Sequence, residues 1–320
     1  MLRAFFIYLS KAAWARHIVT RWAFAWRAAS RFVAGEKLED AIRAVRALND
    51  KGINATLDHL GENTTNADEA RQATHAITEI IDAIDASGVR SNVSIKLSQI
   101  GMKVDKGLCA ENLRIILARA SEKGNFIRID MEDAPTVDYT LELFRKMKSE
   151  HGFTNCGVVI QAYLYRSNKD VCSLLGDLSK IRLCKGAYKE PSDVAFPLKK
   201  DVDANYDKLV EMMIDAVIDS ASSTISEDGK FPPLPAIATH DPKRIENAKS
   251  YARKVGLPKT SMEFQMLYGI RRDLQEQCVM EGYPVRVYVP YGTEWYPYFV
   301  RRLAERPANV WFFISNFFRK

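Results

Sequence analysis

The alternation of short β-rich runs with longer helical segments constrains the fold most strongly. The β-rich runs lie at residues 55–60, 93–97, 126–131, 157–163, 181–185, 236–239, 263–267 and 285–289. Between them lie segments with helical spacing and length, such as 68–86 and 205–220. Strands that alternate with helices indicate a parallel sheet. Eight such units in about 250 residues predict an α/β fold of the closed (β/α)8 barrel type, with an open doubly wound sheet as the alternative.

Composition and charge favour one large domain without a nucleic-acid partner. The chain has 320 residues, of which 47% are apolar, enough for one core. We predict an N-terminal amphipathic helical arm over residues 1–50 and a barrel with an aromatic C-terminal tail over residues 51–320. The net charge of +6 is mild and spread along the chain. The five cysteines are scattered without metal-like spacing, which fits a reducing compartment. The oligomeric state stays open.

The first 35 residues are basic and aromatic and contain no Asp or Glu. Their charges interrupt the apolar runs well before the roughly 18 residues that a spanning helix needs. Such a segment could lie on an anionic membrane surface, or form a helix pair packed on the domain, and the two interpretations are compatible. A mitochondrial transit peptide is a third interpretation, because those peptides are also Arg-rich and poor in acids.

A barrel places its active site at the carboxyl ends of the strands. The residues at the predicted strand ends are mostly polar or aromatic. They are Asp58, His59, Lys96, Asp130, Glu132, Asp133, Gln161, Lys185, Gly186, Ala187, Tyr188, Thr239, His240, Gln265, Leu267, Tyr268 and Tyr288. We therefore expect the functional site among these residues.

The helix expected after the eighth strand carries an arginine pair. At about 100° per residue, Tyr298, Arg301, Arg302 and Glu305 fall within an arc of about 100°. Two guanidiniums presented together suit one small carboxylate, and Glu305 could orient one of them. The alternative is an ordinary solvated Arg-Arg-Glu face.

Two strand-end lysines raise a different chemistry. Lys96 or Lys185 could form a Schiff base, as in a barrel lyase. Lys96 could instead be the charge partner of Asp130 or of a substrate carboxylate.

The acidic cluster and the histidine each have a functional and a structural interpretation. Asp130, Glu132 and Asp133 could bind a divalent metal. We favour a structural role for Glu132 and Asp133, with Asp133 capping the helix that Pro135 begins, and predict no metal site. His59 has no second histidine matched to it, so we expect a polar histidine whose hydrogen bonds are satisfied. No GxGxxG follows a strand, so a redox cofactor would bind in another way.

Several strand-end motifs together resemble the proline dehydrogenase family. They are VSIKLSQ, IRIDMED, VVIQAYL, IRLCKGAY, EFQMLYG, VRVYVPYG and YPYFVRRLAERPAN, in this order from about residue 50 to residue 312. RLCKGAY and RRLAERPAN are the most specific of them. The length resembles the compact monofunctional bacterial form.

This resemblance implies a distorted (β/α)8 barrel whose last helix covers the barrel mouth. It also implies oxidation of L-proline to Δ1-pyrroline-5-carboxylate, with a hydride passing to N5 of FAD and electrons passing to a membrane quinone. Arg301, Arg302 and Lys96 match the residues that bind the substrate carboxylate. Asp130 matches an acidic residue that we expect to orient Arg302 and Tyr288.

The resemblance also assigns the walls of the site and the cofactor contacts. The residues expected around the proline ring are Tyr288, Tyr298, Leu267 and Tyr188. The residues expected to hold FAD are Met131, Gln161, Arg182, Lys185, Gly186, Ala187, Thr239, His240 and Glu305. Arg182 would stabilise the electron-rich reduced flavin; from its residue type alone, it could equally be a strand arginine paired with a neighbouring carboxylate. The bulky Tyr288 favours proline over hydroxyproline as substrate.

A quinone partner would bring the protein to the inner face of the cell membrane from the cytoplasm. The basic arm at residues 1–35 could supply surface attachment, and the aromatic tail after residue 310 could do the same or pack on the barrel. Two other functions remain open: a Schiff-base lyase using Lys96 or Lys185, and a non-enzymatic membrane-surface module.

Overall fold

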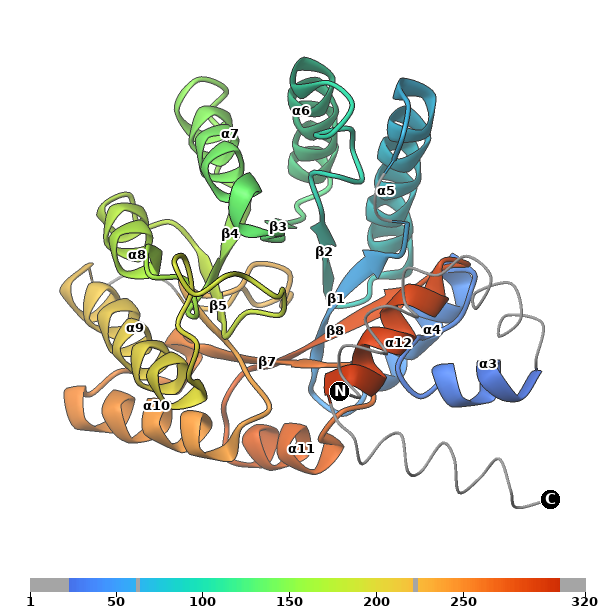
Figure 1. Cartoon of the computed structure of the whole chain (residues 1–320). Helices are drawn as coiled ribbons and strands as arrows, with labels where there is room; N and C mark the ends of the chain where they lie inside the picture. Colours follow the sequence, from blue (N-terminus) through green and yellow to red (C-terminus); the bar gives the residue numbers. More distant parts are fainter. Residues whose placement is uncertain (1–22, 62–63, 221–223, 306–320) are drawn as a thin grey trace.

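A closed parallel barrel forms the body of the protein. The computed structural model describes residues 23–61, 64–220 and 224–305. Within them, each of eight strands pairs in parallel with the next, and β8 pairs with β1 (Figure 1). The predicted (β/α)8 class is therefore confirmed, and the open sheet is wrong.

The strand positions agree with the alternating pattern of the sequence. The strands are β1 (Asn54–His59), β2 (Ser91–Ile95), β3 (Ile127–Ile129), β4 (Cys156–Gln161), β5 (Ile181–Cys184), β6 (Pro235–Ala238), β7 (Glu263–Leu267) and β8 (Val285–Tyr291). Every observed end lies within two residues of the predicted end.

Helices follow the strands on the outside of the barrel (Figure 1). They are α5 (Ala67–Ser87), α6 (Lys106–Glu122), α7 (Val137–Ser149), α8 (Ser167–Gly176), α9 (Lys199–Ser220), α10 (Pro242–Val255) and α11 (Arg272–Met280). The ends of α5 show why such segments are helical. The Asn66 side chain accepts a hydrogen bond from the Glu69 amide, and Gly88 ends the helix in the left-handed conformation at φ 65°.

The last helix leaves the regular barrel pattern. Helix α4 (Leu38–Asn49) precedes β1 and packs on both β1 and β8, the outer position that a helix after β8 would normally take. Helix α12 (Trp295–Glu305) instead joins a separate apolar cluster that contains Leu60 and Ile270. Because these two residues follow β1 and β7, α12 lies at the carboxyl ends of the strands.

The segment before α4 anchors α12. Helix α3 (Ala23–Ala29) brings the Trp26 ring to 5.4 Å from the Trp295 ring, and the Phe32 ring lies 6.3 Å from the Phe299 ring. The chain then crosses the end of β8, where the Ala34 amide donates to the Pro290 carbonyl at 2.9 Å. For this part of the arm the packed-helix interpretation is correct.

The other terminal predictions fall on residues that the structure does not describe. Residues 1–22, with most of the basic arm, and the aromatic tail from residue 306 onward both lie outside the described ranges. Across the described part of the chain, no helix combines the length and apolarity needed to cross a membrane.

Gly157 on β4 lets a buried arginine occupy the barrel. A Cβ at this position would lie 2.4 Å from the Lys180 carbonyl oxygen and 2.5 Å from Arg128 Nη1. We expect Gly157→Ala to lower the free energy of unfolding by about 3 kcal/mol, because the added methyl group displaces backbone or a fully buried side chain. Urea unfolding measures this change. Gly176→Ala is the matched control, since nothing lies within 4 Å of a Cβ there; equal losses in both variants would contradict the packing argument.

Candidate active site at the barrel mouth

The barrel interior is unusually polar. In most (β/α)8 barrels, branched apolar side chains fill the interior. Here hydrogen bonds run across the barrel between strands that are not neighbours, such as Arg182 on β5 to Ser94 on β2 at 3.1 Å. Ala236 and Ala238 on β6 pair in register with Arg182 and Gln265, and their small side chains leave room for the longer ones.

Asp130 is the centre of this polar interior. Its carboxylate accepts hydrogen bonds from Ser94 Oγ at 2.7 Å, Arg182 Nη1 at 2.8 Å and the Tyr288 hydroxyl at 2.7 Å. Lys96 Nζ lies 3.5 Å from its second oxygen. Burial disfavours the charged carboxylate, but Lys96, Arg182 and these hydrogen bonds outweigh it and lower the Asp130 pKa. Burial and the nearby Asp130 charge raise the Tyr288 pKa well above its usual value.

The lowered Asp130 pKa predicts a loss of stability in acid. A carboxyl group whose pKa is lower in the folded state stabilises the fold above its unfolded pKa of about 3.9, and this contribution is lost as the pH falls through the folded pKa. We expect the free energy of unfolding to fall less steeply between pH 5 and about pH 3 in Asp130→Asn than in the unmodified protein. Urea titrations across this range measure the difference. Parallel slopes would contradict it.

Both strand-end lysines are ion-paired. Lys96 Nζ lies 3.2 Å from Asp58 Oδ1, as well as close to Asp130. Lys185 Nζ lies 2.5 Å from Asp203 and 2.8 Å from Asp241. The structure therefore gives Lys96 the charge partner that the sequence suggested, and sets Lys185 in an ion cluster at the end of β5.

The hydrogen bonds of the Arg182 side chain use two of its three nitrogens. Its Nε donates to Gln265 Oε1 at 2.5 Å, and its Nη1 donates to Asp130 and Ser94. Within the part of the chain that is described, no hydrogen bond or ion pair involves Nη2. A mostly buried guanidinium with an unused donor fits an electron-rich ligand group at the mouth, in addition to the carboxylate pairing that its residue type suggested.

The other residues expected to hold FAD lie at the ends of β3 to β6. Gly186 has φ 115°, and a Cβ there would lie 2.3 Å from the Tyr163 ring, so only glycine fits. Next to it, Ala187 is exposed. Met131 and Gln161 line one small cavity.

Hydrogen bonds fix the polar members of this group. The Gln161 side chain donates to the Glu132 carbonyl at 2.8 Å. Thr239 Oγ1 accepts from the Asp241 amide at 3.1 Å, and His240 Nε2 accepts from the Leu267 amide at 2.9 Å.

Two side-chain predictions need correction. Glu132 is buried and accepts from the Ser98 amide and hydroxyl, which agrees with a structural role. Asp133 precedes the 3-10 turn Ala134–Thr136 as expected, but its side chain makes no capping hydrogen bond. Pro135 has no amide hydrogen, and the Ala134 and Thr136 amides donate to the Glu190 side chain and to the Asp133 carbonyl instead. His59 is not fully satisfied: its Nδ1 is buried without a hydrogen-bond partner among the described residues, and burial lowers its pKa.

The residues expected around the substrate come from α12 and the strand ends. Arg301 and Arg302 are half-buried, and the Arg302 guanidinium lies 5.0 Å from the centre of the Tyr298 ring. Leu267 packs against the α12 cluster, whereas Tyr188 is exposed on its loop. The side chain of Glu305 lies outside the described residues.

Sequence reasoning missed part of the interior network. The residues without an assigned role were Ser94, Glu263, Gln265 and Arg286. On β7 and β8, the two-residue spacing of polar side chains could have revealed them, because it puts Glu263 and Gln265 on the same face as Leu267, and Arg286 on the same face as Tyr288.

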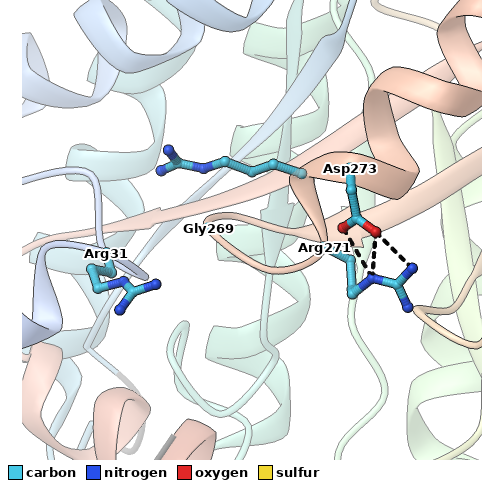
Figure 2. Close-up of a pocket in the computed structure, with 5 residues that line it drawn as sticks. Arg31, Gly269, Arg271 and Asp273 are labelled. Carbon is cyan, nitrogen blue, oxygen red and sulfur yellow. Dashed lines mark hydrogen bonds and ion pairs between the residues drawn. The ribbon is translucent and has the colours of Figure 1, made fainter. Parts of the chain in front are cut away.

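A second hollow, of about 370 Å³, lies apart from the predicted residues. It is lined by Arg31, Gly269, Arg271, Arg272 and Asp273 (Figure 2). Arg271 and Asp273 form a two-pronged ion pair there, with a shortest contact of 2.8 Å. None of these residues belongs to the predicted site.

This geometry defines a class of protein, a (β/α)8 barrel with a charged interior whose last helix lies at the carboxyl ends of its strands. A sequence model described as proline dehydrogenase matches residues 41–314. The chain belongs to the proline dehydrogenase family.

Named relatives agree with this assignment. The chain is 45% identical over 294 residues to "Proline dehydrogenase" of Deinococcus radiodurans, covering 91% of this chain and 90% of that one. It is 38% identical over 318 residues to "Proline dehydrogenase 2" of Bacillus subtilis, covering 99% of each.

A solved structure shares the fold. The crystal structure of proline utilization A from Bdellovibrio bacteriovorus, inactivated by N-propargylglycine, superimposes with a TM-score of 0.79 at 27% identity. The match covers 88% of this chain and 33% of that protein, so this chain spans about a third of its length.

Proposed function

We propose that the protein oxidises L-proline to Δ1-pyrroline-5-carboxylate with bound FAD and passes the electrons to a membrane quinone. The observation that carries the proposal is the Asp130 cluster at the strand ends, which holds Lys96, Arg182 and Tyr288 together. Its support from outside the structure is the similarity to proteins named proline dehydrogenase.

The substrate carboxylate would bind to Arg301, Arg302 and Lys96. Proline carries one carboxylate and one amine on a small apolar ring, so charged recognition is needed at only one end. Two guanidiniums and an ammonium provide charge-assisted hydrogen bonds to that end. The half-buried position of the arginines would strengthen these bonds by limiting solvent screening.

The apolar part of the ring would be recognised by shape. Tyr288, Tyr298 and Leu267 are the proposed walls, with Tyr188 completing them from its exposed loop. The Tyr288 hydroxyl is committed to Asp130, which keeps the phenol ring in one orientation. We expect hydroxyproline to be a poorer substrate, because its added hydroxyl group would crowd this ring.

FAD, when bound, would supply the hydride acceptor. Arg182 Nη2 would face the flavin ring, with Met131 and Gln161 beside it. The peptide backbone of residues 185–187, Thr239, His240 and Glu305 would hold the remainder of the cofactor.

Asp130 would act by holding cations rather than by taking a proton from carbon. It fixes Arg182 and Tyr288 through short hydrogen bonds and lies close to Lys96. A site that gathers positive charge stabilises the extra electron density of a reduced flavin and the carboxylate of the substrate together.

Product analysis tests the reaction. Incubation of the flavin-loaded protein with L-proline and a soluble quinone is expected to give a product lighter by two hydrogens and to reduce the quinone. Hydroxyproline serves as the comparison substrate. A product that forms from proline without quinone reduction would overturn the electron-acceptor part of the proposal, and no product would overturn the reaction.

The basic arm would bring the protein to the inner face of the cell membrane. We expect removal of residues 1–22 to reduce binding to anionic vesicles, because these residues carry basic side chains that anionic lipid attracts. Activity with a soluble acceptor dye should change less than about twofold, because the truncated form keeps the contacts of Trp26 and Phe32 with α12. Co-sedimentation with vesicles measures binding, with vesicles of neutral lipid as the control. Equal binding by both forms would contradict the proposed attachment.

A further inference from the structure

A row of buried polar side chains connects Arg182 to the floor of the barrel. Arg182 Nε donates to Gln265 Oε1 at 2.5 Å. The other end of the same amide, Gln265 Nε2, donates to Glu263 Oε1 at 2.6 Å. Gln265 is 5% exposed and Glu263 is fully buried, so no solvent replaces either bond.

Arg286 fixes Glu263 in turn. Its Nε and Nη2 donate to the two carboxylate oxygens at 2.8 and 2.9 Å, and neither side chain is exposed. Two further donors of Arg286 bind the Ala55 carbonyl at 2.7 Å and the Gly229 carbonyl at 2.6 Å. Every nitrogen of the guanidinium thus makes a hydrogen bond, and the two parallel bonds to Glu263 hold its carboxylate in one place.

The chemistry of these groups sets the orientation of the amide. Both oxygens of the Glu263 carboxylate accept hydrogen bonds from Arg286, so Glu263 pairs with the nitrogen end of Gln265. The oxygen end must then face Arg182. A flipped amide would place its NH2 group against the guanidinium, where two donors meet and neither is satisfied.

We propose that Gln265 is a positioning residue for Arg182, and that Glu263 and Arg286 act through it to fix the guanidinium that faces the flavin. The inference rests on the proposed function. Asp130 and Ser94 hold Nη1 from one side of the barrel and Gln265 holds Nε from the other, so the plane of the guanidinium is set by three side chains and Nη2 is presented to the ligand.

The substitution Gln265→Leu removes the oxygen that accepts from Arg182 Nε and keeps a side chain of similar volume. A hydrogen bond to a charged group is worth about 1.5–3 kcal/mol, or about tenfold to hundredfold in an equilibrium or rate. We expect FAD to bind to the apoprotein at least tenfold more weakly and the bound flavin to be reduced by proline about tenfold more slowly. The flavin potential should also shift to a lower value, which loss of packing alone would not cause.

An exchange of the two side chains supplies the rescue. In Glu263→Gln/Gln265→Glu the new carboxylate accepts from Arg182, and the new amide donates to that carboxylate and still accepts from Arg286 Nη2. The bond from Arg286 Nε is lost, because Glu263 Oε1 accepts from both Gln265 and Arg286 and an NH2 group takes its place. The total charge is unchanged. We therefore expect partial rescue: FAD affinity, flavin potential and reduction rate lie closer to those of the unmodified protein than they do in Gln265→Leu or in Glu263→Gln alone. Glu263→Gln alone frees the amide of Gln265 to flip and should remain impaired. Gln277→Leu on the exposed face of α11 is the control for the substitution itself.

Each outcome decides the inference. Unchanged FAD affinity, potential and reduction rate in Gln265→Leu would overturn it. If Gln265→Leu does not fold, the comparison of Glu263→Gln with the exchange variant Glu263→Gln/Gln265→Glu tests the inference. Equal FAD affinity, flavin potential and reduction rate in these two variants would overturn it. If the unmodified protein binds FAD but proline does not bleach the flavin, the proposed function fails and the inference fails with it. If proline bleaches the flavin and the variants match the unmodified protein in FAD affinity, flavin potential and reduction rate, only the inference fails.

Discussion

Replacing Arg302 by methionine is expected to lower kcat/KM for L-proline by about 10²- to 10³-fold and to leave flavin bound. Losing one partner of a hydrogen-bonded charge pair shielded from solvent costs about 2–5 kcal/mol, and each 1.4 kcal/mol is tenfold. Methionine keeps a long apolar side chain against the Tyr298 ring, which lies 5.0 Å from the guanidinium. The loss should therefore reflect the charge rather than the packing of α12.

Steady-state kinetics with a soluble acceptor and the visible flavin spectrum measure the two parts of this expectation. Arg114→Met is the matched control, because Arg114 is exposed on α6 and, among the residues that the structure describes, pairs only with Glu111 on the same helix turn. Exposed pairs of this kind contribute little. Unchanged proline kinetics in Arg302→Met would contradict the carboxylate site, and loss of flavin would show that Arg302 serves the cofactor instead.

Replacing Asp130 by asparagine is expected to be costly for both stability and turnover. The substitution keeps the size of the side chain and removes the negative charge between Arg182 and Lys96, whose side chains are 8% and 12% exposed. Breaking a buried ion pair costs about 3–5 kcal/mol, because a buried charge loses its compensation. We expect the free energy of unfolding to fall by about 3 kcal/mol, and proline turnover to fall by about 10²-fold or more, since Arg182 and Tyr288 lose their common partner.

Urea unfolding and proline kinetics measure these effects. Asp82→Asn is the control: Asp82 pairs with Arg119 at 2.7 Å on the outer surface, where about 1 kcal/mol or less is expected. A stable Asp130→Asn protein with normal turnover would contradict the central role of this carboxylate.

The sequence predicted the fold well because hydrophobic periodicity reports it directly. Strands such as β7 (Glu263–Leu267) are short β-rich runs bounded by helical segments, and the number of such units specified the barrel. The start of helix α9 was predicted less well. The helix begins at Lys199, six residues before the predicted start at 205, and the prediction missed its first turn because that turn is mostly polar and gives little apolar signal. Periodicity also did not reveal that α4 takes the outer position next to β1 and β8, since that depends on packing between distant segments.

The sequence placed the site at the strand ends but not its internal order. Position along the barrel strands put Lys96, Asp130 and Tyr288 among the strand-end residues, and the resemblance to the family paired Asp130 with Tyr288. The structure brings the three side chains together. Partner choice depends on distances across the barrel. Asp130 therefore pairs with Arg182 on β5, and the link from Gln265 to Glu263 could not be read from spacing.

The first measurement to make is a visible absorption spectrum of the purified protein, loaded with FAD, before and after L-proline is added without oxygen. We expect a flavin spectrum that bleaches with L-proline and not with other amino acids, because the carboxylate site and the apolar ring walls would together select this substrate. A bound flavin that proline leaves oxidised, or a protein that takes up no FAD, would contradict the proposed function.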